Sequence, residues 1–190
     1  MNTRPLGLFP ALLALGLCMS ACAIVKPHLD ASRTTPIDWG LEGARSSAIT
    51  VLPFVAHGQD ERWGIYAARR MHEFLLAAKA FERVLYVEQE PVATPYVLKG
   101  EIDALYYGGT FTPTSVQVTV RVINRRDGQT RLLTTLSAEA ENRGLDLELL
   151  TRKYVSAPYP EQVLNGILKE LARTIAQRTH AAPSGARGLE

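Results

Sequence analysis

The feature that most constrains this fold is a stretch in which valine alternates strictly with polar residues. In SVQVTVRVIN, every second residue from Val116 to Val122 is valine, and Gln117, Thr119 and Arg121 occupy the positions between. Successive side chains of a β-strand point to opposite faces of the sheet. The pattern therefore predicts a strand with one buried face and one solvent-exposed face.

Other short segments predict the rest of a sheet. RDGQ, residues 126–129, contains the Asp-Gly pair favoured in tight hairpin turns, so TRLLTTLSAEA should return antiparallel beside the valine strand. The apolar runs AITVLPF (48–54) and ERVLYVE (82–88) and the roughly alternating YVLKGEIDALYY (96–107) predict three further strands.

Two segments have the apolar periodicity of helices. Between the first two strands, apolar residues recur at three- and four-residue steps from Ile65 to Ala78, which predicts a helix ending near Ala80. A second apolar stripe runs from Val163 to Ile175 behind Pro160, a residue well tolerated in the first turn of a helix. The order βαββββα predicts a single α/β domain over residues 48–180, with a mixed, largely antiparallel sheet and helices on one face.

The first 21 residues predict an export signal. Arg4 is followed by a leucine-rich run that is shorter than the roughly 20 apolar residues needed to span a bilayer. The stretch Met19 to Cys22 resembles the bacterial lipobox, in which two small residues precede a cysteine that is acylated and becomes the mature N-terminus. Cys18 fits less well because bulky Leu17 precedes it. We predict lipidation at Cys22; the alternative is a plain signal peptide cut elsewhere.

Lipidation has consequences for the rest of the chain. Loss of Cys18 and acylation of Cys22 would leave no free thiol, which excludes a disulfide or thiolate metal site. Several acyl chains on one cysteine hold a protein durably on a membrane. Ala23 follows the cysteine, where aspartate signals inner-membrane retention in enteric lipoproteins, so the resemblance implies the periplasmic face of the outer membrane.

The segments that flank the domain are polar. Residues 22–47 lack a sustained apolar period and predict an extended, lipid-anchored tether. Trp39 and Leu41 are expected to dock on the domain of the same chain; the alternative is a neighbouring subunit. Residues 181–190 predict a disordered tail.

Charge and motifs exclude several function classes. The chain has 21 basic and 19 acidic residues, and loss of Arg4 with the signal leaves 20 against 19, too little excess to attract nucleic acid. Neither a phosphate-binding glycine loop nor a nucleophile elbow is present in the sequence. We therefore predict no enzyme activity and no cofactor.

Two groups of polar residues are candidates for chemical sites. A loop and the helix after it could surround a metal ion if the loop folds back. The residues concerned are His57, Asp60, Glu61, His72 and Glu73. Their spacing matches no strong motif, and a solvated loop is favoured. Glu88 and Glu90 could form an acid–base pair, but a solvated strand end is favoured. The sequence thus predicts no catalytic residue and no metal ligand.

Aromatic residues mark two candidate partner surfaces. YYGGTFTPT, residues 106–114, joins two strands where a tight turn would suffice, and TRKYVSAPYP, residues 151–160, leads into the last helix. Exposed aromatics are effective anchors for a partner. The alternative is that Tyr106 and Phe111 pack over the end of the core. The predicted partner contacts are Tyr106, Tyr107, Phe111, Tyr154 and Tyr159.

The succession ITVLPF, FERVLYVE, YVLKGEID and RRDGQT, with the valine strand and a closing helix, resembles small bacterial envelope lipoproteins. One group comprises the curli-secretion channel subunit, the periplasmic activator of a peptidoglycan synthase and the ring-forming Pel-polysaccharide lipoprotein. A second comprises the auxiliary lipoproteins of ABC-type lipid-transport systems. The resemblance spans residues 48–179. It implies a non-enzymatic adaptor or scaffold within an envelope transport or assembly complex, which in some members is a homo-oligomer.

Three functions are alternatives to an adaptor or scaffold. A pore former would need a membrane hairpin alternating over about 9–11 residues per strand, and the TFTPT loop is too short for this. A periplasmic lipid- or glycan-binding carrier of an ABC-type system would need a cleft between sheet and helices. A metal-dependent hydrolase would require His57 and His72 to converge.

Overall fold

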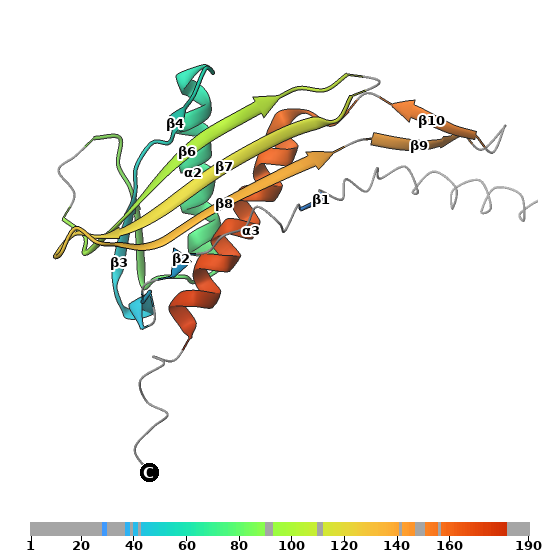
Figure 1. Cartoon of the computed structure of the whole chain (residues 1–190). Coiled ribbons are helices and arrows are strands. Elements are labelled where there is room, and N and C mark those ends of the chain that lie inside the picture. The colour runs from blue at the N-terminus through green and yellow to red at the C-terminus, as the bar shows by residue number, and fades with distance from the viewer. Residues whose placement is uncertain are drawn as a thin grey trace, which may run out of the picture.

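The computed structural model of the chain describes residues 28–29, 37–38, 40–41, 43–89, 93–109, 112–140, 142–146, 151–155 and 157–181. It shows a mixed sheet with two helices packed against one face, which confirms the predicted fold class (Figure 1). The helices are η2 (Ala44–Ser46), α2 (Glu61–Ala77) and α3 (Pro160–His180). The strands are β1 (His28–Leu29), β2 (Ile37–Asp38), β3 (Ala48–Val51), β4 (Val55–Ala56), β5 (Arg83–Tyr86), β6 (Tyr96–Tyr106), β7 (Thr114–Asn124), β8 (Thr130–Ala140), β9 (Asn142–Asp146) and β10 (Thr151–Val155).

The main sheet combines an antiparallel half with a parallel half. Its strand order is β1-β8-β7-β6-β3-β5, with β2 also paired to β8 and β4 to β6. Strands β6, β7 and β8 are antiparallel and joined by short connections, whereas β3 runs parallel to both β5 and β6. Parallel neighbours need a crossover, and α2 supplies it between β3 and β5. The predicted strand–helix–strand unit and the predicted valine hairpin are both present.

The core lies between the sheet and the two helices. Val116, Val118, Val120 and Val122 are all buried there, together with the apolar stripe of α3. We call this side of the sheet the covered face and the opposite side the open face. Every second residue of β7 therefore contributes to the core, as the alternation predicts.

Two elements end where local backbone chemistry requires it. Helix α2 stops at Ala77, three residues before the predicted end, because Lys79 adopts a left-handed conformation (φ 51°). The N–H groups of Ala80 and Lys79 then donate to the carbonyls of Leu75 and Leu76, which is a Schellman ending. The first predicted strand ends at Val51, ahead of Pro53, which lacks an N–H group, and a separate short strand, β4, follows at Val55–Ala56.

Part of the predicted tether contacts the sheet. His28 pairs with Glu139 in β1, and Ile37 pairs with Leu133 in β2. Leu41 is fully buried in the core, in agreement with its expected docking, while Trp39 lies outside the described residues. The predicted signal, Cys22 and residues 182–190 also lie outside them. Within the described part of the chain, neither α2 nor α3 is long and apolar enough to cross a membrane.

A second, two-stranded sheet was not foreseen from the sequence. Strands β9 and β10 pair antiparallel over five residues each, so Thr151–Val155, expected only as part of the segment that leads into the last helix, forms a strand. Figure 1 shows this small sheet beyond the end of β8. The hairpin thus prolongs the same end of the domain at which β6 finishes and β7 begins.

Candidate functional site

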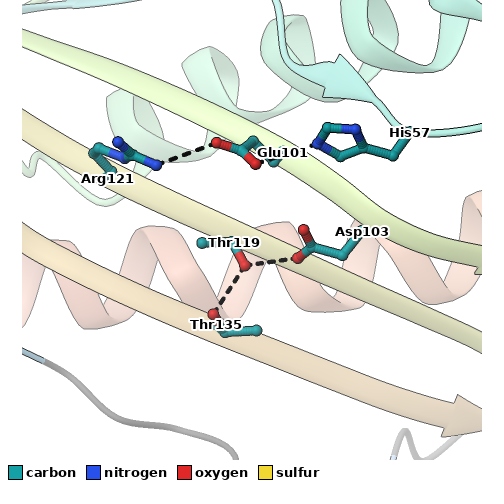
Figure 2. Close-up of polar contacts among 6 residues, drawn as sticks. All are labelled: His57, Glu101, Asp103, Thr119, Arg121 and Thr135. Atoms are coloured by element: carbon teal, nitrogen blue, oxygen red, sulfur yellow. Dashed lines mark hydrogen bonds and ion pairs between the residues drawn. The ribbon is translucent and has the colours of Figure 1, made fainter.

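The open face of the sheet carries a polar cluster built from β6, β7, β8 and the segment after β4. Its members are His57, Glu101, Asp103, Thr119, Arg121 and Thr135 (Figure 2). Strand alternation explains their common side, because they occupy positions between the residues that face α2 and α3. The covered face and the polar cluster are thus two products of one periodicity.

Strand β4 brings His57 to this cluster. Val55 and Ala56 pair in parallel with Glu101 and Ile102, and the N–H of His57 donates to the carbonyl of Ile102 at 3.1 Å. The Nε2 atom of His57 then lies 3.2 Å from Oε2 of Glu101. A two-residue strand therefore fixes a histidine beside a carboxylate that is 44 positions away in the sequence.

Asp103 lies on the same face, at a β-bulge. The register of β6 against β7 shifts between Ile102 and Ala104, so Asp103 is the extra residue. The hydroxyl of Thr119 donates to Oδ2 of Asp103 at 2.6 Å, and the hydroxyls of Thr119 and Thr135 are 2.8 Å apart. Thr119 has one hydroxyl proton, which goes to the carboxylate, so Thr135 must donate to Thr119. The result is a directed chain of hydrogen bonds across three strands.

The second oxygen of Glu101 is held by Arg121. Its Oε1 atom accepts from Nη2 of Arg121 at 3.2 Å, in a pair whose side chains are 45% and 36% exposed. An ion pair this open to solvent contributes little to stability. Its role is to orient Glu101 between Arg121 and His57.

The cluster offers one nitrogen and two carboxylates to a cation. One ligand atom from each of His57, Glu101 and Asp103 lies within 4.8 Å of the other two. A tetrahedral metal ion with bonds of about 2.1 Å needs ligand atoms about 3.4 Å apart, so the set would have to contract around an ion. Arg121 and Thr119 already engage the two carboxylates, which is typical of a surface hydrogen-bond network. We assign the cluster to ordering of the open face.

The polar residues weighed from the sequence have other roles. Asp60 caps α2: its carboxylate accepts from the guanidinium and the backbone N–H of Arg62 at 2.9 Å, and these bonds, the guanidinium first, lower the pKa of Asp60. Glu88 pairs with Arg69 at 3.2 Å, and Glu90 lies outside the described residues. His72 lies within α2 and is absent from the polar cluster of the described residues. His57 therefore meets Glu101 and Asp103, partners that the spacing did not indicate.

Three of the predicted partner-contact residues come together at one end of the domain. Tyr106, Tyr107 and Tyr159 are 55%, 45% and 67% exposed, and the rings of Tyr107 and Tyr159 stack at 5.5 Å with an interplanar angle of 8°. The exposure of Tyr106 argues against its packing over the core. Phe111 lies outside the described residues, and Tyr154 is part of β10. We call this end of the domain, where Tyr107 stacks on Tyr159 and Tyr106 lies on the open side of β6, the tyrosine end.

The buried hydroxyl of Thr114 links the two segments that carry Tyr107 and Tyr159. Oγ1 of Thr114 donates to the carbonyl of Pro158 at 2.6 Å and accepts from the N–H of Gly108 at 3.1 Å. Ala157 donates its N–H to the carbonyl of Gly109 at 2.9 Å. The segment after β6 and the segment before α3 are thereby joined, which fixes the Tyr107–Tyr159 stack.

Comparison with known proteins identifies similar structures but no sequence family. Neither a protein-family model nor a curated protein sequence matches the chain. The PelC dodecamer from Paraburkholderia phytofirmans matches with a TM-score of 0.56 at 15% identity, covering 78% of this chain and 99% of that one. A point variant of that PelC matches at 0.58 and 16%, covering 78% and 98%. A Xanthomonas campestris protein of the DUF330 family matches at 0.51 and 12%, covering 70% and 85%. At these identities the shared property is the fold.

Proposed function

We propose that this chain is a lipid-anchored envelope protein that acts, without catalysis, as an adaptor or scaffold of a transport or assembly complex at the periplasmic face of the outer membrane. The observation that carries the proposal is the match to PelC over 98–99% of that chain, together with the lipobox at Cys22. Fold likeness is an analogy for function, so the surfaces must support it.

The surfaces of the domain favour binding over chemistry. The tyrosine end presents three exposed aromatic side chains on a backbone fixed by Thr114. Rigid, exposed tyrosines are characteristic of contact surfaces. The open face carries a hydrogen-bonded polar cluster whose carboxylates are already engaged. Both features favour a protein whose function is to bind other molecules.

Homo-oligomerisation is part of the proposal. The PelC structures are dodecamers, and this chain shares the fold of their subunit. Most soluble oligomers are formed by copies of one chain. We expect the purified protein to be larger than a monomer in detergent.

A carrier function is less well supported by the packing. Such a function needs a cleft between the sheet and the helices, where leucines of α3 and valines of β7 fill the space. Two described cavities, of about 520 and 380 Å³, lie elsewhere: one beside η2 and the turn after α2, the other between the outer sides of α2 and α3. The scaffold hypothesis requires no such cleft.

The proposal is tested by isolating the protein from its envelope. A C-terminally tagged full chain and its Cys22→Ser variant are expressed at equal level, and membranes are separated by density. We expect the unchanged chain in the outer-membrane fraction, with partner proteins and a multimeric mass in mild detergent, and the variant outside that fraction. A wild-type monomer that retains lipid and no partner would overturn the scaffold in favour of a carrier.

A further inference from the structure

We propose that the tyrosine end of the domain rests directly on the lipid surface that holds the acylated Cys22. This inference depends on the proposed lipidation and adds to it the orientation of the domain and a second membrane contact. It is derived from the number of residues between Cys22 and β1, the strand register and the exposed tyrosines.

The pairing of β1 fixes the direction in which the chain leaves the sheet. His28 pairs with Glu139 and Leu29 with Ala138, antiparallel to β8. Strand β8 runs toward Ala140, so His28 is the residue of β1 nearest that end of β8. Strand β6 also ends there, and β7 begins there. The described residue nearest Cys22 in the sequence therefore lies at the tyrosine end, away from the β7–β8 turn.

The strand register and the number of intervening residues limit how far Cys22 can lie from the tyrosine end. His28, Glu139, Ser115 and Tyr106 are successive partners across β1, β8, β7 and β6. Strands are about 4.8 Å apart, which places β1 about 14 Å from β6 along this row. The six residue steps from Cys22 to His28 span at most about 20 Å. An anchor of this reach holds the tyrosine end next to the bilayer.

The chemistry of this end suits a membrane interface. Tyrosine rings are amphipathic, and they concentrate where lipid headgroups meet the acyl chains. Three exposed tyrosines gather here, and the stacked pair Tyr107–Tyr159 is held by backbone contacts beneath it. The domain thus offers the bilayer a rigid aromatic surface beside its acyl chains.

The test exploits the absence of other thiols from the mature, acylated chain. A single cysteine replaces Tyr106 or Tyr159, or Arg126 in the exposed β7–β8 turn as the control. The turn is about 33 Å from the tyrosine end, ten residue steps of about 3.3 Å along β7. Each full-length lipoprotein carries an environment-sensitive dye and is incorporated into vesicles of phosphatidylethanolamine and phosphatidylglycerol, with or without doxyl-labelled lipid. Circular dichroism checks that each variant is folded.

We expect dyes at positions 106 and 159 to shift to the blue and to lose most of their emission to doxyl lipid, while the dye at 126 stays quenchable by aqueous iodide. Equal responses at all three positions would overturn the proposal. Dyes at 106 and 159 that are protected from iodide but not quenched by doxyl lipid would also overturn it, because a second copy of the chain would then cover this end. Mass analysis of the N-terminal peptide separates the two hypotheses. An unacylated Cys22 contradicts the proposed function, whereas acylation without quenching contradicts only the docking.

Discussion

The two faces of the central sheet are formed by alternate residues of the same strands, yet they depend on different information. On the covered face, Val118 and Val120 are buried simply because they belong to the apolar row that meets α3. On the open face, Thr119 meets Asp103 only because β6 and β7 pair in one register with a bulge. Burial follows from local periodicity, whereas a polar cluster follows from strand pairing. The predictions below test this difference, from the largest expected effect to the smallest.

The covered face should be most sensitive in the middle of α3. Leu168 is fully buried in the core, and Leu168→Ala would leave a cavity as well as lose apolar burial. We expect a loss of about 3 kcal/mol in the free energy of unfolding, measured by urea denaturation. Lys169→Ala, at the exposed neighbouring position, is the control and should change little. A similar loss for both variants would contradict the separation of faces.

The same distinction explains what the sequence could and could not reveal. The valine row, the hairpin and both helices follow from short-range patterns, and the structure confirms them. Strand β4 has only two residues and no pattern of its own, so the meeting of His57 with Glu101 was not foreseen. The end of α2 was misplaced because Lys79 takes a conformation that usually favours glycine.

The tyrosine end was predictable in part. Tyr106, Tyr107 and Tyr159 stand out in the sequence as aromatics near loops, but the stacking of Tyr107 on Tyr159 requires the contact between the segments after β6 and before α3. The strands β9 and β10 were missed because their residues have no clear alternation of polar and apolar side chains. Lipidation of Cys22 and the partner contacts remain predictions.

Thr114 is a polar residue on the covered face, and its side chain has hydrogen-bond partners. It occupies the row of the buried valines, and its hydroxyl links Gly108 to Pro158. Thr114→Val keeps the shape but leaves a buried N–H and a buried carbonyl without this partner, so we expect a loss of about 2 kcal/mol. Urea denaturation gives the value. An unchanged stability would mean that the hydroxyl is dispensable for fixing the tyrosine end.

Thr134 is a second buried threonine on the covered face, and it differs from Thr114 in its hydrogen bonding. It lies on the covered face of β8, 1% exposed, and its hydroxyl has no hydrogen-bond partner among the residues that the structure describes. Thr134→Val removes a buried polar atom without breaking a described bond, so we expect a gain of about 1 kcal/mol in the free energy of unfolding. Thermal and urea unfolding should both report it. A destabilised variant would show that the hydroxyl has a partner, such as a buried water.

The smallest effect should come from the open face. Arg121→Gln removes the ion pair with Glu101, in which both side chains are partly exposed. Solvent and salt screen such a pair, so we expect a change in unfolding free energy within about 0.5 kcal/mol, smaller still at high ionic strength. Urea unfolding of the monomer and of the detergent-solubilised assembly should be compared. A loss well above 1 kcal/mol in the assembly alone would mean that another molecule covers the open face there. The two faces would then differ only in what covers them: helices of the same chain on one side, and a partner on the other.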